Sequence, residues 1–138
     1  MAKAQIMIFE QVLLFLISVA IFISCFSLFS LYQNHFSFIA LNDQVKAVRD
    51  VISSQVLELA RFEEMNISTR LRVPKKISGE RYRMEFTGPN LTIITEETRT
   101  SASADFSRIA SGYIFSGNSI RSKGEIIIYK RGNNIILG

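Results

Sequence analysis

The stretch VLLFLISVAIFISCFSLFSL, residues 12–31, decides the fold of this chain. It holds 20 consecutive residues without a charge, and its hydroxyl-bearing members are Ser18, Ser24, Ser27 and Ser30. About 20 apolar residues in a helix cross a hydrocarbon layer about 30 Å thick. Serine is tolerated there because its hydroxyl can bond the carbonyl one turn earlier. The stretch therefore predicts a membrane-spanning helix over about residues 11–32.

The alternative interpretation of this run is a secretory signal that is removed after export. Such signals have an apolar region of about 7–15 residues, followed by a cleavage site of small residues. Here the run is longer, and no Ala-x-Ala pattern follows it before His35. A helix that is retained in the membrane is therefore the favoured prediction.

The distribution of charge predicts an orientation for this helix. Lys3 and the chain amine precede the run, and the first charges after it, Asp43, Lys46, Arg49 and Asp50, are balanced in sign. Counting positive charges near the span favours a cytoplasmic N-terminus and an exported C-terminal part. Two glycosylation sequons, at Asn66 and Asn90, agree with export. We expect a single-pass protein of the cell membrane, or an extracellular location if copies of the chain assemble into a filament.

Beyond the membrane the apolar residues keep a helical spacing. Steps of three and four residues place one stripe on a single helix face: Val45, Val48, Ile52, Val56 and Leu59. The sequence thus predicts one long helix over residues 5–62, with residues 33–37 as its weakest point. The stripe needs a cover, which either the C-terminal domain or neighbouring helices could provide.

From residue 66 onward the apolar spacing changes to two, the period of a strand with one buried face. We expect strands over 67–73, 81–86 and 91–95, weaker ones over 108–115 and 119–121, and a hairpin of 125–129 with 134–137. Turns are predicted at 87–90 and 130–133, and a loop at 99–105. The expected fold is α+β: a long N-terminal helix followed by a small antiparallel sheet or sandwich over 66–138, which packs on the helix stripe.

Composition excludes several classes of function. A single Cys25 cannot form a disulfide within the chain, and with a single His35 it cannot supply a Cys/His zinc site. No nucleophile motif or phosphate-binding loop is present, so we expect neither an enzyme nor a bound cofactor. Sixteen basic against 12 acidic residues give a net charge of +4, so no specific nucleic acid partner is expected. The pair Glu96 and Glu97 is interpreted as an exposed acidic strand end.

Six basic residues lie close together in the first part of the β region. We expect pairs of them from adjacent strands to share a solvent face that could engage anionic lipid headgroups, nucleic acid or acidic glycans. The favoured alternative is an ordinary solvated face, because Glu80 and Glu85 are interleaved with them. The six residues are Arg70, Arg72, Lys75, Lys76, Arg81 and Arg83.

Glu10 stands out because apolar residues lie on both sides of it, Ile6 to Phe9 before it and the run from Val12 after it. A carboxylate at the middle of a membrane costs about 2.5–3.5 kcal/mol, less near the edge, and points by default to a function. The alternative is a side chain that reaches the lipid headgroups, and position alone does not decide between the two. Ala20, Ser24 and Ser27 form a stripe of small residues that permits close approach of another helix.

The segment Lys3-Ala4-Gln5-Ile6-Met7-Ile8-Phe9-Glu10, the apolar helix and the β-rich region together resemble type IV pilin-like proteins. The closest likeness is to the archaeal group with class III signal peptides, which includes the archaellins. The resemblance implies that a prepilin-type peptidase removes residues 1–4 as a leader by cutting between Ala4 and Gln5. It also implies that Glu10 neutralises the new N-terminal amine of a neighbouring subunit.

The expected function is therefore that of a structural subunit of a type IV pilus-like or archaellum-like filament. Its expected partners are membrane lipid, the prepilin-type peptidase, and identical or related subunits contacted through the N-terminal helix. The alternative is a bitopic, membrane-anchored module that binds something outside the cell and does not polymerise.

Overall fold

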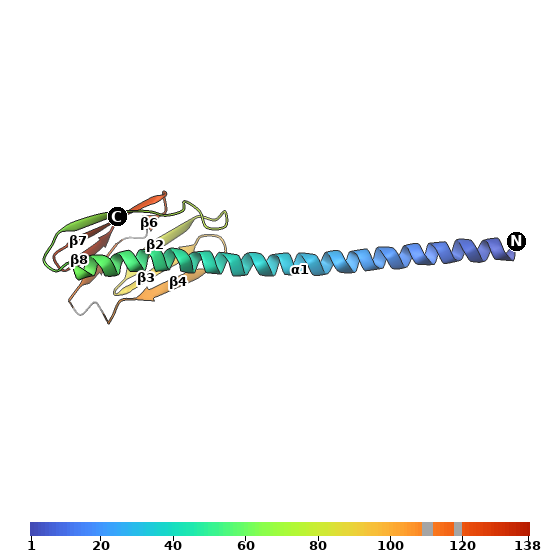
Figure 1. The fold of residues 1–138 in the computed structure, drawn as a ribbon, viewed down its shortest axis with the longest axis horizontal. Coiled ribbons are helices and arrows are strands. Elements are labelled where there is room, and N and C mark those ends of the chain that lie inside the picture. The colour runs from blue at the N-terminus through green and yellow to red at the C-terminus, as the bar shows by residue number, and fades with distance from the viewer. Residues whose placement is uncertain (109–111, 118–119) are drawn as a thin grey trace. The chain divides into compact units, whose positions relative to one another are not determined.

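The computed structural model describes residues 1–108, 112–117 and 120–138 (Figure 1). The chain forms two compact units, Met1–Phe38 and Ile39–Gly138. A single helix, α1 (Ala2–Arg61), supplies the first unit from its second residue onward and the beginning of the second unit. The predicted long N-terminal helix is thus confirmed, and residues 33–37, its expected weak point, are helical. By length and composition α1 can cross a membrane.

The second unit combines the C-terminal part of α1 with two four-stranded sheets. The strand order is β1-β7-β8-β5 in one sheet and β4-β3-β2-β6 in the other. The predicted α+β class is confirmed. The strands are β1 (Ile67–Arg72), β2 (Tyr82–Thr87), β3 (Asn90–Thr95), β4 (Ser101–Asp105), β5 (Ile114–Ser116), β6 (Ile120–Arg121), β7 (Glu125–Arg131) and β8 (Asn134–Leu137).

The structure corrects the predicted loop at 99–105, since this segment contains β4. Ala102 is buried and Ala104 packs against the core, while Ser101 and Ser103 are exposed. Strand β4 pairs antiparallel with β3, with Asn90 opposite Asp105. The alternation was present in the sequence. Because alanine and serine are weak strand formers, it did not stand out against a polar loop.

A second correction concerns the direction of β5, which pairs parallel with β8 rather than antiparallel. Two parallel strands must be joined by a long connection. Nothing in the sequence of β5 or β8 indicates that these two strands pair in parallel. The weaker strands were expected at 108–115 and 119–121. Part of each range, residues 109–111 and 119, lies outside the described residues.

Both predicted tight turns are confirmed, and each depends on a glycine. Gly88 (φ 59°) begins the two-residue loop between β2 and β3, and Gly132 (φ 57°) begins the loop between β7 and β8. A positive φ at the first loop residue alone is the pattern of the type II′ turn, which suits the right-handed twist of paired strands. These glycines set the register of the two hairpins.

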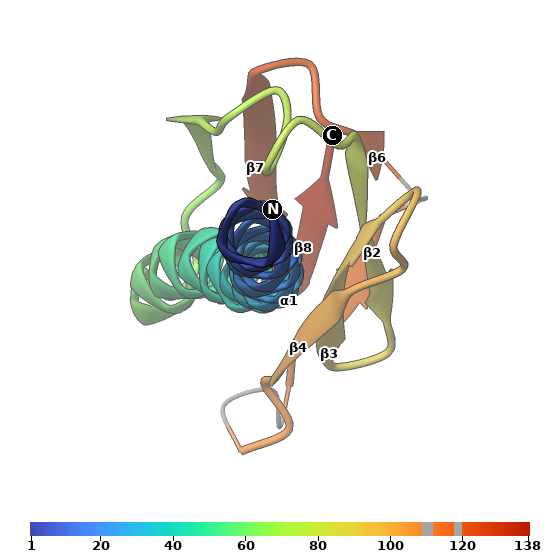
Figure 2. The same cartoon turned by 90° about the vertical axis from the view of Figure 1, so that its right-hand side faces the viewer.

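The core of the second unit joins the helix stripe to the inner faces of both sheets. All five predicted stripe residues are buried, and Leu41 extends the stripe by one turn. Figure 2 shows β7 and β8 apart from β2, β3 and β4, and buried residues of both sheets share one cluster with the stripe. The prediction that the sheet region covers the stripe is confirmed. The buried strand residues include Tyr82, Met84, Leu91, Ile93, Ile126, Ile128 and Ile135.

Candidate functional site

The helix surface of the first unit is apolar and uncovered. Phe15, Phe22 and Phe29 are 67%, 71% and 66% exposed, and none of the most hydrophobic helical window is buried. Soluble proteins rarely expose so large an apolar surface, which marks a site of contact with lipid or with other proteins. The first candidate site is therefore this surface itself.

Three serine hydroxyls within this surface are satisfied by the helix. The hydroxyls of Ser18, Ser24 and Ser27 each donate to the carbonyl four residues earlier, at 2.8 Å. These serines thus present little unsatisfied polarity to an apolar partner. Ser24 and Ser27 share one helix face with Ala20, so the predicted stripe of small residues is compatible with close helix contact.

Glu10 and the expected leader junction both lie in the first turns of α1. Glu10 is exposed, flanked by the exposed apolar side chains of Ile8, Phe9 and Val12. The peptide bond between Ala4 and Gln5 is helical, and the Gln5 amide donates to the Met1 carbonyl at 3.3 Å. A peptidase would need this turn to open. Terminal turns open at little cost in free energy because few contacts hold them.

The six basic residues do not come from adjacent strands, so that part of the prediction was wrong. Arg70 and Arg72 belong to β1 at the edge of one sheet, whereas Arg83 belongs to β2 in the other sheet. All six are exposed, and Arg70 pairs with Glu125 on the neighbouring strand at 3.9 Å. Sequence adjacency misled here because β1 pairs with β7, which is more than 50 residues away in the chain.

The two sequons lie in accessible positions. Asn66 and Asn90 are both exposed, Asn66 just before β1 and Asn90 at the start of β3. The side-chain oxygen of Asn66 accepts a hydrogen bond from the Gly132 amide at 3.1 Å. Neither asparagine is buried, and the hydrogen bond of Asn66 uses its side-chain oxygen rather than the amide nitrogen that glycosylation modifies. Modification stays a prediction.

Sequence reasoning missed a polar junction at the end of α1. The Lys130 ammonium, 1% exposed, donates to the carbonyl of Phe62, and the Tyr113 hydroxyl donates to the carbonyl of Ala60 at 2.9 Å. The sequence predicts Lys130 in the hairpin turn at 130–133, whereas the structure places it in β7. Its position continues the buried alternation of Ile126 and Ile128, and that alternation was the signal available in the sequence.

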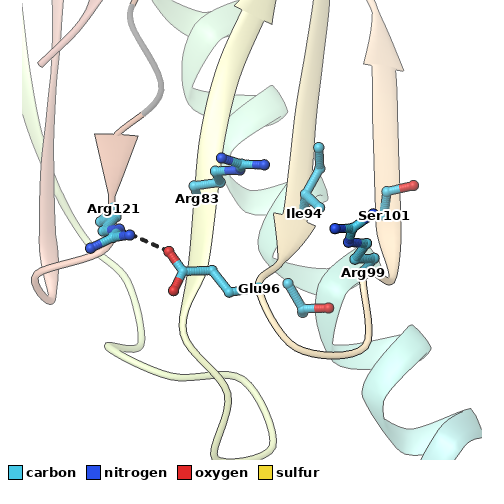
Figure 3. A pocket seen from close by; sticks show the side chains of 7 residues that line it. Arg83, Ile94, Glu96, Arg99, Ser101 and Arg121 are labelled. Atoms are coloured by element: carbon cyan, nitrogen blue, oxygen red, sulfur yellow. Dashed lines mark ion pairs between the residues drawn. The ribbon is translucent and has the colours of Figure 1, made fainter.

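Three arginines and one glutamate of the second unit line a shallow depression of about 620 Å³ on the outer face of the β4-β3-β2-β6 sheet (Figure 3). Arg121 pairs with Glu96 at 2.8 Å. Glu96, expected only as an exposed strand end, thus belongs to an ion pair. The lining residues are Arg83, Ile94, Thr95, Glu96, Arg99, Ser101 and Arg121.

Backbone pairing aligns four of these residues in one row across the sheet. Arg121 lies opposite Arg83, Arg83 opposite Ile94, and Ile94 opposite Ser101. Two arginines directly opposite each other repel, which costs stability unless a counter-charge lies nearby. Of the basic cluster predicted from the sequence, Arg83 alone lines this depression.

The turn at one end of this depression is held by a network of threonines. Thr95 is buried, and its hydroxyl accepts a hydrogen bond from the Thr100 amide at 2.9 Å. The amide and hydroxyl of Thr98 both donate to Glu80, each at 3.1 Å. Arg99 lies within this turn with φ of 54°, a left-handed conformation that non-glycine residues seldom adopt.

Within residues 1–108, 112–117 and 120–138, no group of three or more His, Cys, Asp or Glu side chains could hold a metal ion. The geometry therefore offers two candidate surfaces, the apolar helix of the first unit and the arginine-lined depression of the second.

Comparisons of the chain with protein-family models, curated proteins and solved structures gave no match.

Proposed function

We propose that this chain is a membrane-inserted, pilin-like structural subunit with an exported β domain, which assembles through its N-terminal helix. One observation carries the proposal. Exposed apolar side chains extend from Ile6 to Ile39, a range of 34 residues in which Glu10 is the one acidic or basic residue apart from His35. At 1.5 Å per residue this segment is about 51 Å long, well beyond the roughly 30 Å that a bilayer core covers.

An anchor alone needs neither this length nor a carboxylate within it. The additional apolar surface suits helices that pack side by side, and the small residues Ala20, Ser24 and Ser27 allow them to approach closely. A carboxylate among such helices needs a cationic partner, because an unpaired charge in an apolar environment is costly. An amine created by cleavage before Gln5 would be such a partner.

The alternative is a bitopic anchored module that does not polymerise. The buried stripe favours it, because Leu41, Ile52 and Leu59 are covered by the chain's own sheets and leave nothing of the stripe for neighbours. Only the first unit would then contact other molecules within the membrane. The two functions differ in whether the helices of different copies pack together.

Substitution of Glu10 separates these functions. If Glu10 pairs with an amine of a neighbouring subunit, Glu10→Gln leaves that amine unpaired, and losing one partner of a buried pair costs about 3–5 kcal/mol. We expect a variant that inserts normally, as membrane fractionation would show, but is absent from filaments sheared from cells. Glu58→Gln, an exposed carboxylate of α1 in the second unit, is the matched control and should assemble normally.

The origin of the amine is tested at the same time. N-terminal sequencing of the native protein should begin at Gln5, and Ala4→Leu should block cleavage and reproduce the Glu10→Gln phenotype. Wild-type levels of Glu10→Gln in sheared filaments would contradict the assembly role of Glu10. A wild-type protein that begins at Met1 or Ala2 and forms no filament would establish the anchored module instead.

Topology has its own test. Protease added to intact spheroplasts should remove the residues that follow position 40, because the proposal places them outside the membrane. A domain that is protected until the cells are lysed would reverse the orientation and exclude a surface filament. Cytoplasmic marker proteins, which must stay intact in the same sample, control for leakage.

A further inference from the structure

We infer that the outer face of the β4-β3-β2-β6 sheet binds an oxyanion, a carboxylate or phosphate carried on a sugar-sized ligand, between Arg83 and Arg99. This binding site goes beyond the proposed structural function and does not depend on assembly. It is argued from the charge balance of the depression, its backbone support and the apolar side chain at its centre.

The charge balance of the depression leaves two cations unmatched. Three arginines and one carboxylate line it, and the carboxylate of Glu96 is engaged by Arg121 at 2.8 Å. Among the described residues, Arg83 and Arg99 form no ion pair. Figure 3 shows the Glu96 carboxylate turned toward Arg121, with Arg83 and Arg99 on opposite sides of Ile94. The unmatched positive charge therefore lies around Ile94.

The pairing of β2 with β6 places two arginines directly opposite each other. Arg83 and Arg121 are direct cross-strand partners, and like charges in such positions destabilise a sheet. The carboxylate of Glu96 neutralises the charge of Arg121. An anion beside Arg83 would compensate the other, and guanidinium groups bind carboxylate and phosphate oxygens through paired N–H donors.

The position of Arg99 is set by the turn that carries it. Its left-handed backbone is enclosed by hydrogen bonds between Thr95 and Thr100, at 3.0 Å from the Thr95 amide and 2.9 Å from the Thr100 amide. The same turn is tied to Glu80 through Thr98. A strained residue held by its surroundings is typical of a binding site, and a fixed backbone lowers the entropy that binding would cost.

The centre of the row favours a ligand with an apolar edge. Ile94 is half-buried between Arg83 and Ser101, its cross-strand partners. Apolar lining with a few placed polar groups is the usual composition of a small-molecule site. The ring of a sugar acid or sugar phosphate could lie on Ile94, with its anionic group between the two arginines and its hydroxyls beside Ser101.

The test is an NMR titration of the full chain in micelles of a neutral polyoxyethylene detergent, at constant ionic strength. The probes are glucuronate, glucose 1-phosphate and glucose. We expect saturable shifts of the Ile94, Arg99 and Ser101 signals with one or both anionic sugars and none with glucose. The two anionic probes distinguish a carboxylate ligand from a phosphate ligand. Equal shifts with glucose, or none with either anion, would overturn the inference.

Three variants test the assignment to these residues. Arg83→Gln and Arg99→Gln should each weaken binding by about tenfold or more, the usual effect of losing a charged hydrogen bond. Glu96→Gln should strengthen binding, because it removes the competing carboxylate and frees Arg121. Arg72→Gln, an exposed arginine on the other sheet, is the matched control and should change the affinity by less than about twofold.

Folding of the variants is checked by circular dichroism and thermal melting. The arginine variants should match the wild type because their side chains are exposed, whereas Glu96→Gln should keep its spectrum and melt slightly earlier because it loses the ion pair with Arg121. Affinities of Arg83→Gln and Arg99→Gln that equal that of Arg72→Gln would show that anions associate only through net charge, and would overturn the site.

Discussion

The buried ammonium of Lys130, on β7, donates a hydrogen bond to the main-chain carbonyl of Phe62, the residue that follows α1. It also lies 5.5 Å from the centre of the Tyr113 ring. The last carbonyls of a helix have no partners within the helix and carry partial negative charge. A cation there donates the missing hydrogen bond and also balances this charge. One lysine thus joins the end of α1 to the sheet β1-β7-β8-β5.

We expect Lys130→Met to destabilise the second unit. Methionine matches the length of the apolar lysine stem but has no ammonium group. The Phe62 carbonyl therefore loses its charged donor, which costs about 1.5–3 kcal/mol. Urea unfolding of the full chain in neutral detergent, followed by circular dichroism, measures this loss. Lys123→Met, at an exposed lysine, is the control. Equal stabilities of the two variants would show that the Lys130 contact contributes little.

The packing of the helix stripe is tested by a pair of neighbouring residues. Ile52 is fully buried against the sheets, whereas Val51 is 47% exposed. Ile52→Ala should lower the free energy of unfolding by about 2–5 kcal/mol because it leaves a cavity. Val51→Ala should change it by less than about 0.5 kcal/mol, as surface substitutions usually do. Similar losses at both positions would contradict the observed orientation of the helix.

The stability of the second unit should fall at alkaline pH through Tyr82. Burial raises the pKa of Tyr82 above its ordinary value of 10.0, and the neighbouring Ser122 hydroxyl partly offsets this. The unfolded chain then loses the Tyr82 proton at a lower pH than the folded chain does. Stabilisation from the neutral phenol is therefore complete below pH 10 and is lost as the pH rises through the folded value.

Tyr82→Phe isolates this effect from other groups that titrate at high pH. At neutral pH the variant should lose about 0.5–1.5 kcal/mol, because the Tyr82 hydroxyl donates to the Pro74 carbonyl at 2.5 Å. Urea unfolding at a series of pH values should show this difference shrinking above pH 10. A difference that stays constant into the alkaline range would mean that burial does not perturb the phenol.

The turn between β7 and β8 should depend on the left-handed backbone of Gly132. An added Cβ would meet no atom within 4 Å, so the cost of Gly132→Ala comes from φ of 57° alone. We expect a loss of about 1–2 kcal/mol in the free energy of unfolding. Gly132→Asn should lose less, because asparagine adopts this conformation more readily. Equal losses in the two variants would assign the cost to another cause.

Local patterns in the sequence were sufficient to predict the elements with strong periodicity. The 20 uncharged residues from Val12 to Leu31 predicted an apolar helix, and the stripe at Val45, Val48 and Ile52 predicted which face is buried. Gly88 and Gly132 marked the two tight turns. Each of these depends on residues near one another in the chain, where spacing alone determines which side chains share a face.

Only the tertiary structure decided which strands far apart in the chain become neighbours. It separated Arg70 and Arg72 from Arg83 by placing them in different sheets, and it brought Arg121 opposite Arg83. Strand pairing joins segments far apart in the chain, and short strands carry little information about their partners because backbone hydrogen bonds are the same for every sequence. For the same reason the contact of Lys130 with the end of α1 could not be predicted. That contact needs the position of β7 relative to the helix, which the packing of the shared core determines.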